Sequence, residues 1–217
     1  MEEMALLNDE IVRNVTEMLS DLTNDVRLVV FTTKNGCEYC KEIVQLAEEI
    51  AATSAKLTAE VYDFDKAPDK AKAFNITMAP AIAIVGQRDY GLRYYGIPSG
   101  HEFSTLLYGI QRASLGRSDL DPQTMNFLDG LNEPVNIQVF VTPTCPYCPR
   151  AAILAYEMAV ASDKVVADVV ESMEFPDLAN HFNVMGVPLS VINSKERVEG
   201  AAPPPVIVNA IRAALSA

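Results

Sequence analysis

The sequence predicts an α/β protein made of two similar domains in tandem. Its 217 residues, 49% of them hydrophobic, are enough for two cores of about 100 residues each. Strand-like apolar runs alternate with segments of helical periodicity, which is typical of α/β domains. The same pattern also recurs at a fixed shift along the chain. We therefore expect one domain at 1–117 and a second at 118–217, with a linker at about 114–120.

The cysteines set the repeat distance. Cys37 and Cys145 are 108 positions apart (145 minus 37), and so are Cys40 and Cys148 (148 minus 40). The same shift relates three further pairs, which are Phe74 and Phe182, Ile76 and Val184, and Pro80 and Pro188. A register kept over more than 40 residues indicates a duplicated domain.

Hydrophobic periodicity predicts the same order of elements in both halves. In the first half we expect a helix at 11–22, a strand at 28–31, a helix at 43–50, a strand at 61–64, a short helix at 70–74, and an antiparallel hairpin of strands at 81–85 and 92–95. In the second half we expect strands at 135–141, 165–170 and 189–192, and a last helix at 206–215.

Local signals mark where three helices begin. Ser99, with Glu102 three residues later, predicts a capping box at the last helix of the first half. Asp121 followed by Pro122 predicts the first helix of the second half. Cys145 is expected to open the helix after the strand at 135–141.

Charge and hydropathy exclude several classes of protein. The formal charge of -12, from 17 basic and 29 acidic residues, disfavours binding to nucleic acid or to anionic membranes. The start of the chain, Met1 to Ala5, is acidic where a secretory signal would be basic. The longest apolar run, Ala79 to Val85, is too short to span a bilayer. We expect a soluble cytoplasmic protein.

The four cysteines form two Cys-x-x-Cys pairs, a pattern that favours chemistry over structural cross-linking. A strand that leads into such a pair and then into a helix places the first sulfur near unsatisfied N–H groups, which stabilise a thiolate. The second cysteine, three positions on, can then attack a mixed disulfide formed by the first. The spacing thus supplies a nucleophile and a resolving thiol.

These motifs carry a resemblance to a known family. The strand, the Cys-x-x-Cys pair, the helix and the later X-Pro strand resemble the thioredoxin fold, and Cys145-Pro146-Tyr147-Cys148 is similar to the glutaredoxin signature. The tandem arrangement resembles the protein disulfide oxidoreductases of thermophilic archaea and bacteria. This resemblance implies two thioredoxin-like domains, each a central mixed β-sheet flanked by helices.

The resemblance also implies a function. Such a protein reduces, forms or isomerises protein disulfides, with Cys37, Cys40, Cys145 and Cys148 as catalytic residues and no bound cofactor or metal. Its implied partners are protein disulfides and dithiols, a peroxiredoxin, and a thioredoxin reductase that supplies electrons from NADPH. Pro80 and Pro188 are implied to be cis, with the preceding Ala79 and Val187 presenting their backbone to an extended substrate.

The neighbours of the two cysteine pairs differ. Glu38 lies inside the first motif, where its negative charge opposes thiolate formation at Cys37. Pro146 is uncharged, and Arg150 follows the second motif. We therefore expect Cys145 to have the lower pKa and its site to be the stronger oxidant.

Other corresponding residues have more ordinary interpretations. Asp63 and Glu171 end equivalent strands, and we favour solvated carboxylates there over a buried proton acceptor for the resolving cysteine. Tyr39 and Tyr147 share a position inside the motifs, where they either contact substrate or are simply half-exposed aromatics.

Three alternatives to redox chemistry follow from the same residues. A structural zinc site made of the four cysteines is disfavoured because 104 residues separate the pairs, where such sites usually have about 15–20. A Cys-His hydrolase is disfavoured because His101 and His181 do not correspond in the repeat, and both are expected to be solvated. A peptide-binding or chaperone module stays open, because the groove beside Ala79 and Val187 could hold an unfolded chain.

Overall fold

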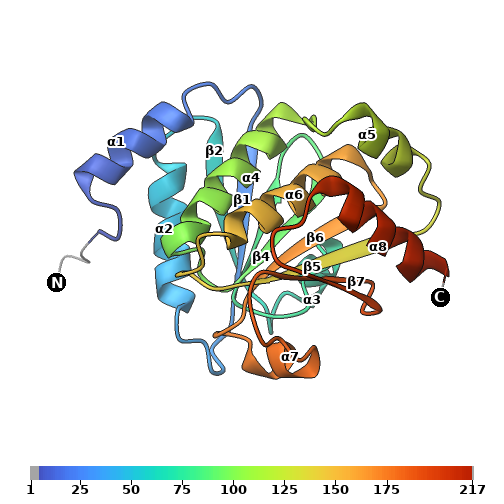
Figure 1. Cartoon of the computed structure of the whole chain (residues 1–217). Coiled ribbons are helices and arrows are strands. Elements are labelled where there is room, and N and C mark those ends of the chain that lie inside the picture. The colour runs from blue at the N-terminus through green and yellow to red at the C-terminus, as the bar shows by residue number, and fades with distance from the viewer. Residues whose placement is uncertain (1–4, 217) are drawn as a thin grey trace.

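A computed structural model describes residues 5–216, and their strands form one continuous sheet (Figure 1). The acidic start, Met1 to Met4, lies outside the described residues. The first half contains α1 (Asp9–Met18), β1 (Val26–Thr32), α2 (Cys40–Ala51), β2 (Leu57–Asp63), α3 (Pro68–Ala73), β3 (Ala81–Val85), β4 (Asp89–Tyr95), the 3-10 turn η1 (Gly100–Glu102) and α4 (Phe103–Leu115). The second half contains α5 (Pro122–Asp129), β5 (Val135–Val141), α6 (Cys148–Ala161), β6 (Val165–Glu171), α7 (Pro176–His181), β7 (Leu189–Ile192), β8 (Glu196–Glu199) and α8 (Pro204–Ser216).

The strand order confirms the duplicated fold and adds a feature that the sequence did not predict. The order is β2-β1-β3-β4-β6-β5-β7-β8, so each half has a mixed four-stranded sheet with the same internal arrangement. The two sheets join through a parallel pairing of β4 with β6, from Leu92 opposite Ala167 to Tyr95 opposite Val170. The halves therefore share one eight-stranded sheet within the described residues.

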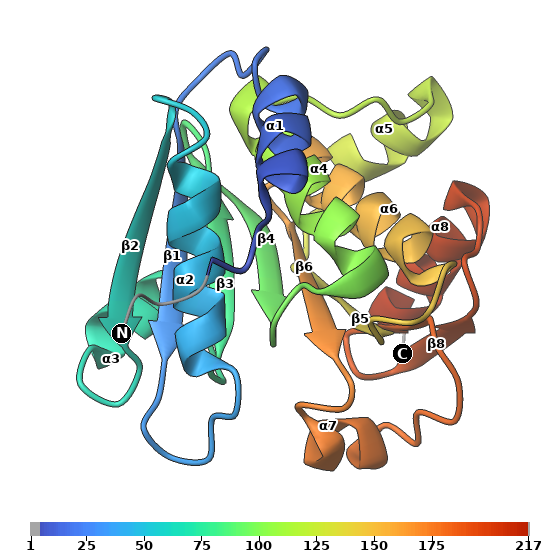
Figure 2. The same cartoon turned by 90° about the vertical axis from the view of Figure 1, so that its left-hand side faces the viewer.

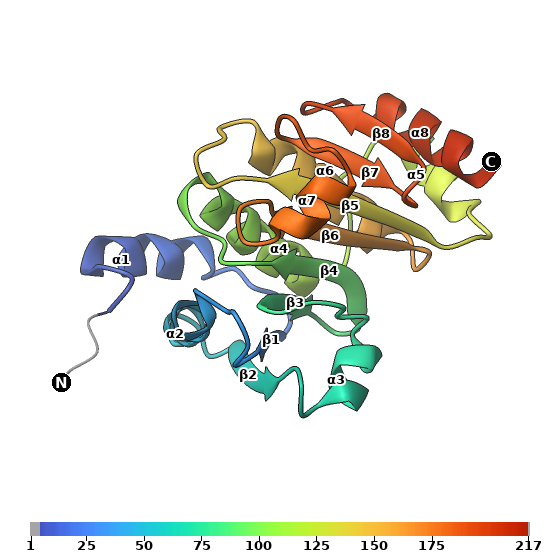
Figure 3. The same cartoon turned by 90° about the horizontal axis from the view of Figure 1, so that it is seen from below.

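Helices cover the two faces of the sheet unequally. Side chains of β1 alternate between the faces, with Leu28 and Val30 in the larger core and Val29 and Phe31 in the smaller one. The larger core lies under α1, α2, α4, α5, α6 and α8, whereas α3 and α7 cover the opposite face (Figures 1 and 3). Figure 2 shows the edge of the sheet at which the loops before α2 and after β6 both lie.

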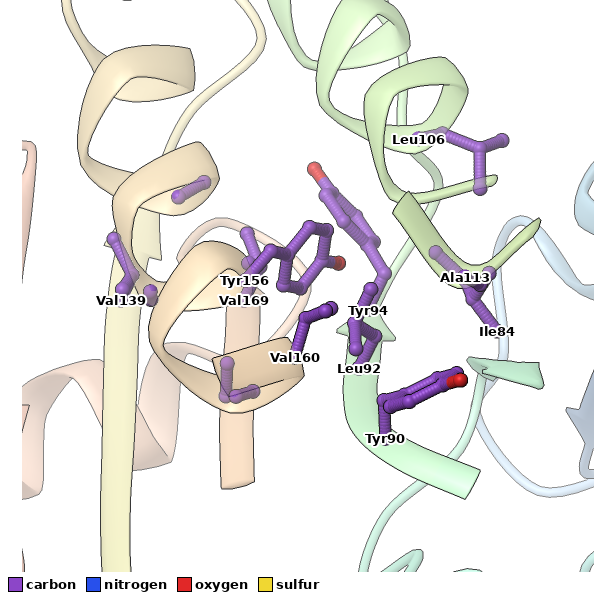
Figure 4. Packing of buried hydrophobic residues seen from close by; sticks show 14 of the residues in the cluster. Ile84, Tyr90, Leu92, Tyr94, Leu106, Ala113, Val139, Tyr156, Val160 and Val169 are labelled. Carbon is purple, nitrogen blue, oxygen red and sulfur yellow. The ribbon is translucent and has the colours of Figure 1, made fainter. Parts of the chain in front are cut away.

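The two halves also meet through buried side chains. Tyr94 of β4 and Tyr156 of α6 lie side by side in the core between them (Figure 4). The Tyr156 hydroxyl donates to the backbone oxygen of Arg93 at 3.0 Å. Nearby, the buried Glu157 carboxylate accepts from Arg112 Nε at 2.8 Å and from Ser118 Oγ at 2.6 Å. These hydrogen bonds and this ion pair between buried polar groups hold the two domains in one relative position.

The expected elements are confirmed, with corrections at several of their ends. The strand β2 begins at Leu57, four residues before the predicted start (61 minus 57). The helix α6 begins at Cys148, so Cys145 lies in the turn before it and does not open it. Asp121 caps α5 as predicted, since its carboxylate accepts from the N–H groups of Gln123 and Thr124.

The capping box at Ser99 is wrong. Ser99 makes no capping hydrogen bond in the described structure, and Glu102, its supposed partner, is completely buried at the end of η1. The reason is tertiary, because the N–H of His101 donates to Pro143 of the other domain at 2.9 Å and draws η1 against it. The helix α4 ends at Leu115, followed by Gly116 at φ 68°, so the connection between domains starts later than predicted. We keep the boundary between 117 and 118 as a proposal.

Candidate active sites

Each Cys-x-x-Cys pair lies where a strand of the central sheet leads into a helix. Cys37 and Cys40 form a disulfide with a Cα–Cα distance of 5.6 Å, and Cys145 and Cys148 form one at 5.4 Å. Since β1 runs parallel to β4, β6 and β5, the carboxyl ends of β1 and β5 lie on the same side of the sheet, and both cysteine pairs follow these ends. Four strand spacings separate β1 from β5, which places these two strands about 19 Å apart in the sheet.

The helix starts next to the sulfurs are free of side-chain caps. Tyr39 and Tyr147 are the N-cap residues of α2 and α6, and neither makes a capping side-chain hydrogen bond. The first-turn N–H groups of each helix therefore remain directed toward the turn that carries Cys37 or Cys145. Partial positive charge at that end of a helix stabilises a thiolate.

A cis-proline accompanies each site, as the resemblance implied. The Ala79–Pro80 and Val187–Pro188 peptide bonds are both cis. The oxygen of Val187 lies 3.7 Å from Cys145 Sγ, so this loop directly faces the sulfur. A pocket of about 320 Å³ lies against the same loop, lined by Met185, Gly186, Val187, Pro188, Leu189, Arg197, Glu199 and Gly200.

The glycines that follow the hairpins hold these loops. Gly96 donates its N–H to Pro80 O at 2.9 Å, and Gly200 donates to Pro188 O at 2.8 Å. Both glycines have positive φ, 92° and 77°, which few other residues adopt without strain. The repeat thus preserves the support of the loop and not only the cysteines.

The first site has a polar surround. The N–H of Thr33 donates to Cys40 Sγ at 3.3 Å, and the Thr33 hydroxyl donates to Asp65 at 2.7 Å. Asp63, at the end of β2, pairs with Lys66 at 3.0 Å, and this hydrogen bond lowers the Asp63 pKa. Asp63 is therefore the partly exposed strand-end carboxylate that we favoured.

Glu171, the counterpart of Asp63, is not solvated as we expected. It is 2% exposed, and its Oε1 has no hydrogen-bond partner in the described structure. Burial raises its pKa, because a charged carboxylate loses hydration there. The cause is again tertiary, since β6 lies at the middle of the joined sheet, whereas β2 lies at its edge.

The second site is more buried than the first, and the turn η1, which packs next to it, carries a buried carboxyl group that sequence reasoning missed. Cys145 is 9% exposed and Cys148 is fully buried. Glu102 follows His101, whose N–H donates to the backbone oxygen of Pro143. Pro143 lies two residues before Cys145 in the chain. Neither carboxyl oxygen of Glu102 has a hydrogen-bond partner within residues 5–216, and burial raises its pKa to about 7. The sequence marked Glu102 only as a helix cap.

The remaining candidates lie on the surface. Tyr147 is 69% exposed, whereas Tyr39 is half-buried beside Glu38. Arg150 is exposed, two residues after the start of α6 at Cys148. The exposure of His101 and His181 confirms the expectation for both histidines.

The arrangement defines a class of protein: both halves have the thioredoxin fold, and two paired-cysteine sites make the chain a tandem thioredoxin-fold disulfide oxidoreductase. The chain belongs to the thioredoxin-domain family, whose model matches residues 26–107 and 135–212. Among solved structures it is similar to a protein disulfide oxidoreductase from Aeropyrum pernix K1, at 30% identity and a TM-score of 0.88. That match covers 96% of this chain and 94% of the other, and it confirms the resemblance inferred from the sequence.

Other relatives are longer proteins or parts of them. The NTD_N/C domain of alkylhydroperoxide reductase AhpF from Enterococcus faecalis V583 has the same fold, with 24% identity, a TM-score of 0.86, and coverage of 94% of this chain and 99% of that one. The F subunit of alkyl hydroperoxide reductase from Staphylococcus epidermidis ATCC 12228 is 24% identical over 192 residues, or 88% of this chain. An NADH dehydrogenase of Bacillus subtilis 168 is 21% identical over 190 residues, also 88% of this chain. The chain spans 35% of the length of each of these two proteins.

No helix between residues 5 and 216 has the length and apolar character needed to cross a bilayer. Over the same part of the chain, no three His, Cys, Asp or Glu side chains converge where they could hold a metal ion. A zinc site with four cysteine ligands would need all four sulfurs at one point, and the sheet geometry holds the pairs apart.

The raised pKa of Glu102 predicts a specific dependence of stability on pH. An unfolded glutamate titrates near 4.3, so the folded protein binds this proton more tightly, and stability is lost as the pH rises from there through about 7. Glu102→Gln removes the ionisable carboxyl group and with it this loss of stability at high pH. We expect the variant to exceed the parent in unfolding free energy by up to about 3 kcal/mol at pH 8 and by nothing at pH 4.

Urea unfolding at both pH values measures this difference, with the exposed Glu133→Gln as the control. The other buried carboxyl groups are present in all three proteins, so their contributions cancel in the differences in unfolding free energy. Equal stability of Glu102→Gln and the parent at pH 8 would contradict a buried, proton-binding Glu102.

Proposed function

We propose that this chain catalyses thiol–disulfide exchange on protein substrates, so that it reduces, forms or isomerises disulfides. The observation that carries the proposal is the disposition of Cys145, whose sulfur lies at an uncapped helix start and 3.7 Å from the Val187 oxygen of a cis-proline loop. The first site repeats this frame with Cys37 and the loop at Ala79 and Pro80.

The proposed reaction transfers two electrons. In the reducing direction, the Cys145 or Cys37 thiolate attacks one sulfur of a substrate disulfide, forming a mixed disulfide and releasing the other substrate sulfur as a thiolate. Cys148 or Cys40 then attacks the mixed disulfide, which closes the enzyme disulfide and releases the second substrate thiol. The substrate gains two electrons, the enzyme dithiol loses them, and the reverse sequence forms a substrate disulfide.

A buried carboxyl supports proton transfer at the second site. The resolving cysteine must lose a proton before it attacks, and an acceptor works best when its pKa is close to the operating pH. Glu102 has a pKa of about 7 and lies next to the loop that carries Cys145. We assign it the task of holding this proton.

Polypeptides are the proposed substrate class. Among the described residues, seven large hydrophobic side chains are exposed, and Tyr147, Met173 and Met185 are three of them, at 69%, 74% and 94%. Met185 lines the pocket beside Pro188, and methionine adapts its shape to varied apolar partners. The counterparts of Met173 and Met185 in the first domain, at a shift of 108, are Asp65 and Thr77. At the pocket beside Pro188, Met185 thus gives the second site a more apolar surround than Thr77 gives the first.

The electron donor and acceptor are proposed from the relatives. The alkyl hydroperoxide reductase protein and the NADH dehydrogenase carry names of electron-transfer proteins, and this chain matches 35% of their length. We propose that a thioredoxin reductase supplies electrons from NADPH, and that a peroxiredoxin or a protein disulfide receives them. Of the two sites, we propose Cys145 as the main nucleophile.

Insulin reduction by dithiothreitol tests the reaction and the roles of the two sites. We expect Cys145→Ser to lower the rate about tenfold or more, Cys37→Ser to lower it less, and the double variant to have no activity above dithiothreitol alone. Repeating the assay with thioredoxin reductase and NADPH tests the proposed donor. A fully active double variant would contradict the proposed function, and stoichiometric zinc in the purified protein would favour the zinc-site alternative.

Placing a charge in the apolar surround tests the substrate class. Met185→Asp adds negative charge beside the Val187 loop, so we expect the KM for insulin to rise several-fold while the rate with a small aromatic disulfide changes little. Thr77→Asp, at the equivalent position of the first site, is the matched control. An equal effect on both substrates would show that Met185 supports the loop and does not bind polypeptide.

A further inference from the structure

The segment that follows β6 lies against the first site. Glu174 Oε1 accepts from the N–H of Ile97 at 2.6 Å, and Glu171 Oε2 accepts from the N–H of Glu174 at 2.7 Å. Gly96, next to Ile97, donates to the oxygen of cis-Pro80. Glu174 of the second domain thus supports the turn at Gly96 and Ile97. Gly96 supports the proline loop of the first site.

The fit at this contact is tight. A Cβ on Gly96 would lie 2.6 Å from Glu174 Oε1 and 2.8 Å from Glu171 Cβ, so only glycine leaves room for the two carboxyl-bearing side chains. A Cβ on Gly200, the counterpart in the second domain, would meet no described atom within 4 Å, because β8 is the edge strand of the sheet. In the described structure, the contact between the hairpin glycine and carboxyl-bearing side chains is therefore specific to the first site.

Charge from the same pair reaches the first motif. Glu38 raises the pKa of the Tyr39 hydroxyl most strongly, and Glu174 and Glu171 add to this effect. The pKa of Glu174 is raised to about 7, mainly by burial and also by the charges of Glu171 and Glu38, although the hydrogen bond from the Ile97 N–H lowers it. Tyr39 and Glu38 lie between Cys37 and Cys40 in the chain, so these carboxyl groups lie within electrostatic reach of the first motif.

The repeat shows that this charge is particular to the second domain. At a shift of 108, Glu171 corresponds to Asp63 and Glu174 to Lys66, which form an ion pair on the surface. In the second domain the basic residue is replaced by an acid, and Glu171 is buried with Oε1 unpaired in the described structure. Above about pH 7, where Glu174 is ionised, two neighbouring carboxyl groups in place of an ion pair produce a negative field toward the first motif.

We propose that Glu174, supported by Glu171, is a positioning residue that the second domain supplies to the Cys37–Cys40 site, where it holds the Pro80 loop and disfavours the Cys37 thiolate. This inference rests on the proposed disulfide exchange. A thiolate stabilises the reduced form of a redox pair, so a nearby negative charge makes the pair more reducing. Domain pairing thereby sets the first site apart from the second.

Glu174→Gln tests this inference, because glutamine keeps an acceptor oxygen for Ile97 and removes the charge. In a Cys145→Ser, Cys148→Ser background, the Cys37–Cys40 pair is equilibrated with glutathione, and its reduced fraction is measured by alkylation and mass spectrometry. We expect the ratio [GSH]²/[GSSG] at half reduction to fall about three- to tenfold, and the Cys37 thiol pKa to fall with it. Glu174→Asp, which keeps the charge, should stay near the parent value.

Glu199→Gln is the matched control, since it removes one exposed charge beside the other proline loop. An unchanged potential in Glu174→Gln, or an equal shift in Glu199→Gln, would overturn the inference. If the parent pair does not exchange with glutathione at all, the proposed function itself fails, and the two failures are thus distinguishable. Circular dichroism confirms that each variant is folded before its potential is compared.

Discussion

The parallel pairing of β4 with β6 is the contact on which the rest of the structure depends. It turns two four-stranded sheets into one, buries β4 on both faces, and fixes which residues of one domain meet the active site of the other. At this seam Arg93 faces Asp168 in register. Arg93 is satisfied by Asp89 and by the oxygen of Phe74, whereas Asp168 accepts from Asn136 at 2.7 Å and has its pKa raised to about 6 by burial. Across the seam, the charge of Arg93 lowers the Asp168 pKa and partly offsets this effect of burial.

The same pairing brings a carboxyl group of each domain to the site of the other. Glu102 of the first domain follows His101, whose N–H donates to Pro143 before the Cys145 loop, and Glu174 of the second domain accepts from the Ile97 N–H beside the Pro80 loop. Neither contact exists in a single thioredoxin fold, because each needs a second domain at the edge of the first sheet. The tandem arrangement therefore gives two similar sites different electrostatic environments. Burial of Cys145 disfavours its thiolate and opposes the difference in charge, so the relative potential of the sites is a balance of these two effects.

Patterns local in the sequence predicted most of the fold and the position of both cysteine pairs. Periodicity located the helices and strands, and the repeat shift related Pro80 to Pro188. Contacts between the halves were not predictable in this way. Glu102 and Ser99 match a capping box by spacing, and only the docking of η1 on Pro143 explains why Glu102 is buried instead. Glu171 and Asp63 occupy the same place in the repeat, and the difference in their burial follows from which strand lies at the centre of the joined sheet.

The difference between the two sites is the central claim, and it can be measured on the unmodified protein. Wild-type chain is equilibrated across a series of glutathione ratios, quenched with acid and alkylated, and each cysteine pair is quantified separately by peptide mass spectrometry. We predict that Cys145–Cys148 reaches half reduction at a lower [GSH]²/[GSSG] than Cys37–Cys40, as the stronger oxidant. Half reduction of Cys37–Cys40 at the lower ratio, or of both pairs at the same ratio, would contradict this account.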